Sequence, residues 1–87
     1  MKNELLVNVL GWLGSLAILL AYGLISARRL RGDSWFYQGL NLVGSVFLIV
    51  NTLHYRALPS AFVNLVWSLI ALLALFNISR KLLRKNG

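Results

Sequence analysis

Charged side chains are scarce in this sequence of 87 residues, and the acidic ones are limited to Glu4 and Asp33. Charged residues make up 13 % of the chain, whereas an average soluble protein has about 25 %. Hydrophobic residues make up 59 %, and so short a chain has too little interior to hide that many apolar side chains from water. The composition therefore predicts an integral membrane protein.

Residues that bind metals or catalyse reactions are equally rare. The sequence has no cysteine, which excludes disulfides and thiolate metal sites, and His54 is its single histidine. The two carboxylates lie outside the long apolar stretches and are too far apart in sequence to form an acid–base pair on one helix. No Gly-rich phosphate loop and no nucleophile-elbow pattern occurs. We therefore expect no enzymatic activity, no metal ion and no cofactor.

Three long stretches of the chain carry no charge. They have 23, 22 and 23 residues and cover 5–27, 34–55 and 57–79. A membrane-spanning helix needs about 20 residues, so each stretch is long enough to cross a bilayer. We predict an all-α integral membrane protein with one domain over residues 1–87, in which three transmembrane helices form a bundle. The helices are expected at about 5–27, 34–54 and 59–79, followed by a basic tail at 80–87.

The basic residues predict how the chain is oriented. The net charge is +7, but the basic residues stand between and after the apolar stretches, where lipid headgroups lie, so we expect membrane lipid rather than nucleic acid as their partner. With three spans, Lys2 and Arg56 share one side of the membrane. The other side holds seven basic residues, namely Arg28, Arg29, Arg31, Arg80, Lys81, Arg84 and Lys85. Because basic loops stay in the cytoplasm, we predict a multi-pass protein of the cell inner (plasma) membrane with its N-terminus outside and its C-terminus cytoplasmic.

Small residues recur at helical spacing in the first and second stretches. They are Gly11, Gly14, Ser15, Ala17, Ala21 and Gly44. Small residues four apart let helix backbones approach closely within a membrane. We predict that these positions pack against other helices, and that a bulky residue at Gly14 or Ala21 would weaken self-association.

The second stretch is the most polar of the three. Asp33 and Ser34 precede it and are both suitable helix N-caps. Within it, Asn41, Ser45 and Asn51 follow steps that place them along one helix face, together with Gly44, Leu48, Thr52 and Tyr55. Lipid cannot hydrogen-bond an amide, so this face must meet protein or a wet cavity. Interhelical hydrogen bonds and a lined pathway are both open interpretations.

The third stretch opens with Leu58–Pro59–Ser60. Proline suits the first turn of a helix, where its missing N–H leaves no hydrogen bond unmade. Asn64 and Trp67 are three residues apart, so they share a helix face. Asn64 is far enough into the stretch that hydrocarbon would surround it, and a polar group there is costly unless it meets protein or water.

Several short motifs together resemble a family of small, uncharacterised bacterial three-helix membrane proteins. These motifs are Gly11–Trp12–Leu13–Gly14, Ala21–Tyr22, Asp33–Ser34, Tyr37–Gln38, Leu40–Asn41–Leu42, Pro59–Ser60 and Asn64–Leu65–Val66–Trp67. The resemblance extends from Leu5 to Phe76. It implies the three-helix architecture but names no activity.

The chain is also distantly similar to the SemiSWEET proteins, bacterial half-transporters of the PQ-loop and SWEET superfamily. Their third helix also begins with Leu-Pro, and a substrate-facing asparagine stands five residues after the proline, as Asn64 stands after Pro59. The similarity implies a homodimer with substrate held between the copies, and a third helix packed between the first two. The chain departs from that pattern at Leu24–Ile25, where the Pro-Gln pair would stand.

Two hypotheses follow for the function. The first is a homodimeric SemiSWEET-like half-transporter for a small neutral polar solute, since no charge lies inside the spans. Its substrate-binding residues would be Tyr22, Asn41, Ser45, Asn51, Asn64 and Trp67. The second is a small membrane scaffold or accessory subunit that does not transport, in which the same amides join helices. Access of water to these positions would distinguish the two.

Overall fold

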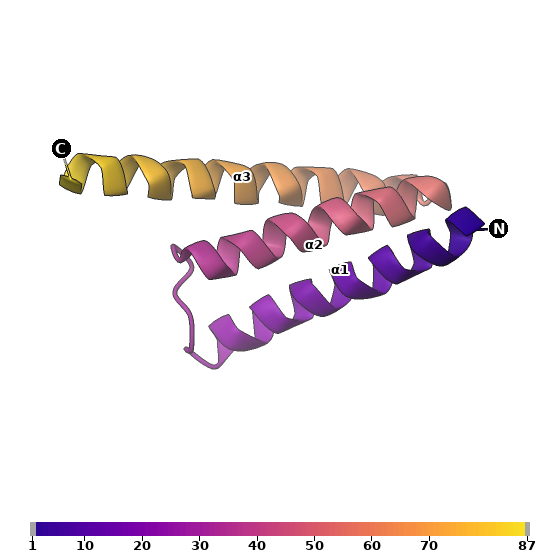
Figure 1. Ribbon diagram of the computed structural model, residues 1–87, viewed down its shortest axis with the longest axis horizontal. Helices are drawn as coiled ribbons and strands as arrows, with labels where there is room; N and C mark the ends of the chain where they lie inside the picture. Colours follow the sequence, from indigo (N-terminus) through magenta and orange to yellow (C-terminus); the bar gives the residue numbers. More distant parts are fainter. Residues whose placement is uncertain (1, 87) are drawn as a thin grey trace.

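The computed structural model describes residues 2–86, with side chains over residues 3–84. It consists of three helices, α1 (Lys2–Ser26), α2 (Trp35–His54) and α3 (Leu58–Asn86), which run alternately up and down (Figure 1). Each helix is long and apolar enough to cross a membrane. The prediction of an all-α chain with three helices of membrane-spanning length is therefore confirmed.

The central helix is α2, with α1 packed on one side and α3 on the other (Figure 1). Over the described residues, α1 and α3 make no contact with each other. The third helix therefore does not lie between the first two, and this implication of the SemiSWEET similarity is wrong. Short connections at 27–34 and 55–57 favour pairing of consecutive helices, and only α2 carries small or polar residues toward both neighbours.

The interior of the chain is built from small residues, and most of the large apolar side chains face outward. The buried residues are Val7, Gly11, Gly14 and Ala21 of α1, Asn41, Gly44 and Ser45 of α2, and Ala61, Ser68 and Ala71 of α3. This pattern is typical of membrane helices, because lipid tails cover large apolar side chains as well as protein does. Close packing of backbones then takes the place of a large apolar core.

A residue with a left-handed backbone follows shortly after each of the first two helices. Arg28 has a φ of 60° and Arg56 a φ of 56°. Around Arg56, the amide of Ala57 donates to the carbonyl of Thr52 at 2.8 Å and the amide of Arg56 to that of Leu53 at 3.1 Å. Arg28 and Arg29 make the same pair of bonds at the end of α1. Both helices therefore close with a Schellman motif, but with arginine where glycine is usual.

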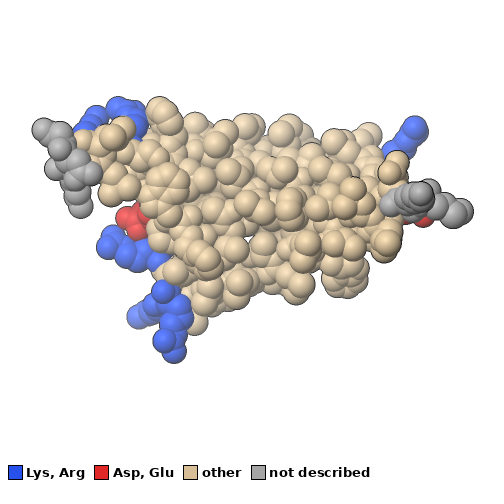
Figure 2. Space-filling model, in the orientation of Figure 1, with Lys and Arg blue, Asp and Glu red and all other residues tan. Residues whose placement is uncertain are grey.

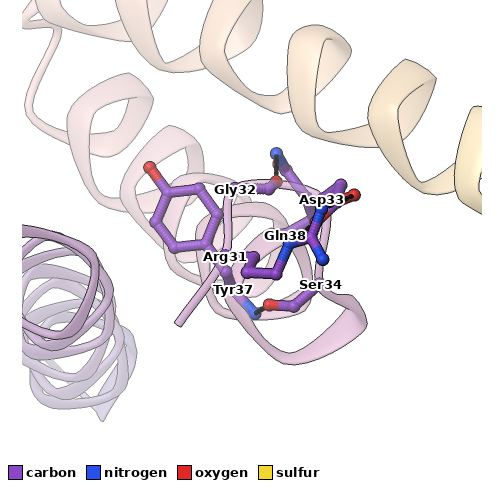
Figure 3. A network of polar contacts seen from close by, with 6 residues as sticks. All are labelled: Arg31, Gly32, Asp33, Ser34, Tyr37 and Gln38. Carbon is purple, nitrogen blue, oxygen red and sulfur yellow. Dashed lines mark hydrogen bonds and ion pairs between the residues drawn. The ribbon is translucent and has the colours of Figure 1, made fainter. Parts of the chain in front are cut away.

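A polar network closes the turn before α2 (Figure 3). The side chain of Ser34 accepts a hydrogen bond from the amide of Tyr37 at 3.1 Å, so Ser34, one of the two predicted caps, is the N-cap. The side-chain amide of Gln38 donates to the carbonyl of Gly32 at 2.8 Å and ties the turn to the helix. Asp33 instead pairs with Arg31, at 3.2 Å.

The third helix continues past the predicted end at Ser79 and reaches Asn86. The residues predicted as a basic tail are mostly Arg, Lys and Leu, which favour helix, and no glycine or proline interrupts them before Gly87. As a result, Arg80, Lys81 and Arg84 extend the helix beyond the apolar stretch.

Basic side chains gather at one end of the molecule (Figure 2). This end holds the turn between α1 and α2, with Arg28, Arg29 and Arg31, and also the basic extension of α3. The opposite end holds the turn between α2 and α3, with Arg56. The fold thus joins two basic segments that are about fifty residues apart in sequence into one basic surface.

Candidate functional site

The six predicted substrate-binding residues do not meet in one cavity within the chain. Asn41 and Ser45 are buried, Asn51 and Asn64 are half-buried, and Trp67 is 45 % exposed. Tyr22 is 68 % exposed on α1, in the half of that helix nearest the basic end. Most of the other five belong to contacts between helices, described below in turn.

Asn51 connects α2 to α1. Its side-chain nitrogen Nδ2 donates a 3.0 Å hydrogen bond to the backbone carbonyl of Val7. Gly11 makes this contact possible, because a Cβ built on Gly11 would lie 2.7 Å from Cγ of Asn51. The sequence predicted Gly11 as a helix-packing position, and the structure shows that it accommodates an amide side chain rather than another helix backbone.

A second contact between α1 and the end of α2 involves the next residue of α1. The hydroxyl of Tyr55, just after α2, donates to Oδ1 of Asn8. Asn8 was absent from the predicted site. Its position was a usable signal, since Asn8 is adjacent to Val7 and Tyr55 lies about one turn after Asn51. An open groove of about 210 Å³ lies beside these contacts, lined by Asn8, Gly11, Trp12, Ser15, Leu48 and Asn51.

Asn41 and Trp67 connect α2 to α3. The indole Nε1 of Trp67 donates to Oδ1 of Asn41 at 2.9 Å, and Nδ2 of Asn41 donates to the carbonyl of Tyr37 at 2.9 Å. Both ends of the buried amide are therefore occupied. The open face of the Trp67 ring borders a small cleft of about 160 Å³ between the two helices.

Ser45 and Ser68 form the most deeply buried polar contact. Their hydroxyl oxygens lie 2.7 Å apart, with Ser68 donating to Ser45, and Ser45 can donate in turn to the carbonyl of Leu42 at 3.0 Å. Ser45 is fully buried and Ser68 is 7 % exposed. The predicted site contained Ser45 but not Ser68.

The predicted small packing residues lie mainly between α1 and α2. A Cβ on Gly14 would lie 2.6 Å from the carbonyl oxygen of Gly44, and a Cβ on Gly44 would lie 3.2 Å from Cβ of Ala17. Ala21 is fully buried, whereas Ser15 borders the groove beside Asn51. This face of α1 thus packs against α2 within the chain, and the predicted effect of Gly14 and Ala21 on self-association stays a prediction.

Asn64 differs from the other amides. Over the described residues its side chain makes no hydrogen bond, and it borders an open groove of about 420 Å³ between α2 and α3. The groove is also lined by Leu48, Thr52, Pro59, Ser60 and Val63. The Thr52 hydroxyl is turned to its own helix and donates to the carbonyl of Leu48 at 2.6 Å. A carboxamide with free hydrogen-bonding capacity in a membrane helix needs water, solute or another chain.

No group of three or more histidine, cysteine, aspartate or glutamate side chains comes together over the part of the chain that was described. The candidate site residues offer amides, hydroxyls and the indole of Trp67, which bind by hydrogen bonding and stacking.

An uncharacterised protein family matches residues 7–82 of the sequence. The chain belongs to this family. The match covers most of each helix and each of the interhelical contacts described above. No curated protein and no solved structure matches the chain. Membership confirms the resemblance to an uncharacterised family, while the SemiSWEET similarity stays a prediction.

Proposed function

We propose that the protein is a small membrane assembly subunit, a scaffold or accessory chain whose polar residues hold α1 and α3 on α2. The observation that carries this proposal is that several polar side chains of the spans form hydrogen bonds between helices. Asn51 reaches the backbone of Val7, Trp67 donates to Asn41, and the hydroxyls of Ser45 and Ser68 meet. Among the described residues, no buried side-chain nitrogen or oxygen lacks a hydrogen-bond partner.

The energetics suit a structural role. A hydrogen bond between membrane helices contributes about 0.6 kcal/mol on average and at most about 1.7 kcal/mol. Three such bonds therefore add little to the free energy of unfolding. They still favour one arrangement of the helices, because breaking one leaves a polar group facing hydrocarbon. A solute that bound to Oδ1 of Asn41 would compete with the indole of Trp67 for that oxygen.

Self-association is part of the proposal. Over the described residues α1 and α3 do not touch, so each keeps a long outward face. Trp12, which is 73 % exposed, lies on such a face, as does the groove containing Asn64. Pairing of two copies as a homodimer would cover the side-chain amide of Asn64 and supply the hydrogen-bond partner that lipid cannot. We place the dimer in the inner membrane, with the basic end in the cytoplasm.

A second candidate function is favoured by the Asn64 groove alone. If two grooves faced each other in a homodimer, they would enclose a polar space, and a small neutral polar solute could cross there as in a SemiSWEET-like half-transporter. The open volume of about 420 Å³ and the free hydrogen-bonding capacity of Asn64 support this candidate. The position of Tyr22 near the other end of the molecule and the paired amides of Asn41 and Asn51 weigh against a pathway lined by all six residues.

Access of water separates the two candidates. The sequence has no cysteine, so single cysteines can be introduced by Asn64→Cys, Asn51→Cys and Asn41→Cys and treated with a small membrane-impermeant thiol reagent. Arg56→Cys serves as the accessible control and Leu69→Cys, on an outward face, as the inaccessible one. The assembly proposal expects the cysteines at all three of these asparagine positions to stay unreactive. A reactive Asn64→Cys whose labelling is slowed by a polar solute would support the half-transporter instead.

A further inference from the structure

The helical extension of α3 forms one wall of a cleft at the basic end of the molecule. Ile78, Lys81 and Leu82 follow the spacing of one helix face, and Arg84 lies one turn beyond Lys81. Together with Asp33 from the turn before α2, they line a cleft of about 310 Å³. Two segments far apart in sequence thus build one concave surface.

The cleft combines an apolar wall with a cationic edge. Ile78 and Leu82 continue the apolar surface of the membrane span, while Lys81 and Arg84 stand at its charged end. Lys81 and Arg84 also line a neighbouring cleft of about 220 Å³ with Asn77 and Arg80. The guanidinium of Arg80 lies 5.9 Å from the ring centre of Phe76, back toward the membrane. Lys81 and Arg84 therefore stand at the edge of the apolar wall, which is where the phosphate of a lipid headgroup meets its acyl chains.

Asp33 gives the opposite wall of the cleft a different chemistry. Its carboxylate pairs with the guanidinium of Arg31 at 3.2 Å (Figure 3), so its charge is compensated by a residue outside the cleft. Its oxygens can still accept further hydrogen bonds. The cleft thus offers cations for a phosphate and, across from them, an acceptor for hydroxyl groups.

We propose that this cleft is a binding site for an anionic glycerophospholipid with a hydroxylated headgroup. Lys81 and Arg84 bind the headgroup phosphate, an acyl chain lies along Ile78 and Leu82, and a headgroup hydroxyl donates to Asp33. The proposal concerns one lipid held in a shaped cleft, which goes beyond the general attraction of basic ends to an anionic membrane surface. It does not depend on whether the protein is a scaffold or a transporter.

Charge and position both favour lipid as the occupant. This end of the molecule gathers the basic residues of two segments against the single carboxylate of Asp33 (Figure 2). A free phosphate would leave the apolar wall of Ile78 and Leu82 uncovered, whereas a lipid covers wall and cations together. A basic side chain near a membrane surface adds about 1 kcal/mol to the binding of anionic lipid, which is about a five-fold change in affinity.

The test measures lipid retained by the purified full chain in detergent, by native mass spectrometry after addition of phosphatidylglycerol. The variant Lys81→Gln with Arg84→Gln removes two cations from the cleft. The matched control, Arg28→Gln with Arg29→Gln, removes two cations from the same end but outside the cleft. We expect the cleft variant to retain at least ten-fold less phosphatidylglycerol and the control to stay within about two-fold of the wild type. Circular dichroism checks that both variants remain helical.

Further arms of the experiment identify the ligand. Phosphatidylcholine should be retained poorly by every form of the protein, and inorganic phosphate or glycerol phosphate should not displace the bound lipid. Asp33→Asn should reduce the preference for phosphatidylglycerol over phosphatidic acid, which has no headgroup hydroxyl. Equal losses of phosphatidylglycerol from the cleft variant and from the control would overturn the proposal, because they would show that lipid binding depends only on the total surface charge. Displacement by inorganic phosphate would overturn it as well, in favour of a free anion.

Discussion

Gly14 of α1 and Gly44 of α2 bring two helix backbones into direct contact. A Cβ on Gly14 would lie 2.6 Å from the carbonyl oxygen of Gly44, and a Cβ on Gly44 would lie 2.9 Å from that of Gly14. Neither backbone can move aside as a flexible side chain would. The absence of both side chains therefore sets the distance between α1 and α2, and with it the reach of Asn51 to Val7.

Adding one methyl group at this crossing should separate the two helices. We expect Gly14→Ala or Gly44→Ala to lower the free energy of unfolding by about 1–3 kcal/mol, as overpacking does elsewhere. The measurement is reversible unfolding in mixed detergent micelles. Gly39→Ala, in α2, is the matched control, because a Cβ there meets nothing within 4 Å. It should leave stability unchanged or raise it by up to about 1 kcal/mol, since alanine favours helix.

A larger substitution at Gly14 tests whether this face of α1 packs within the chain or between copies. Because Gly14 and Ala21 pack within the chain, Gly14→Leu should unfold or rearrange the monomer rather than separate intact copies. A variant that keeps full helix content and stability but loses its oligomers would contradict this expectation. In that case the face would belong to a contact between chains.

Glycine should be better than arginine at the end of α2. Arg56 has a φ of 56°, and a left-handed conformation costs a residue with a Cβ about 1–2 kcal/mol. We expect Arg56→Gly to stabilise the protein by about 1 kcal/mol. Arg56→Ala removes the same charge but keeps a Cβ, so it should bring no such gain. Equal stability of the two variants in the same unfolding assay would show that the backbone strain at Arg56 is relieved in another way.

The sequence predicted the helices well, because length and lack of charge are strong signals in a membrane protein. It predicted Ser34 as one of two N-caps, and it identified Gly14, Ala21 and Gly44 as packing positions. It placed the end of the third helix too early, since charge marks the edge of a membrane but does not stop a helix. Arg80 to Asn86 are good enough helix formers to continue it.

The order of the helices and the partners of the amides could not be obtained in this way. In a soluble protein an apolar stripe reveals which helix face is inside, but here nearly every face is apolar and lipid accepts large side chains. Polar residues mark a face that avoids lipid without naming its partner. Asn51 therefore predicted a buried contact, whereas the backbone carbonyl of Val7 carried no sequence signal at all. Nothing in the sequence identified Ser68 as the partner of Ser45 either.

The bond between Trp67 and Asn41 can be measured by a double-mutant cycle. Trp67→Phe keeps an aromatic ring but removes the N–H donor, and Asn41→Leu removes the acceptor. We expect a coupling energy of about 0.6 kcal/mol, with an upper limit of about 1.7 kcal/mol. The single variant Trp67→Phe should cost stability, since it leaves Oδ1 of Asn41 without this donor. A coupling of zero would mean that the indole and the amide do not meet in the membrane.

The orientation of the chain follows from the two turns at opposite ends of the molecule. The turn containing Arg31 shares its end with the basic extension of α3, whereas the turn containing Arg56 lies at the other end. Because positively charged segments are retained in the cytoplasm, Arg56→Cys should react with an impermeant thiol reagent in intact cells. Arg31→Cys should react only after the cells are opened. Each variant removes one charge, so the basic end keeps a large excess over the other and the orientation should survive. Labelling of both cysteines from outside would rule out three spans, and labelling of Arg31→Cys alone would reverse the orientation and place the lipid cleft outside the cell.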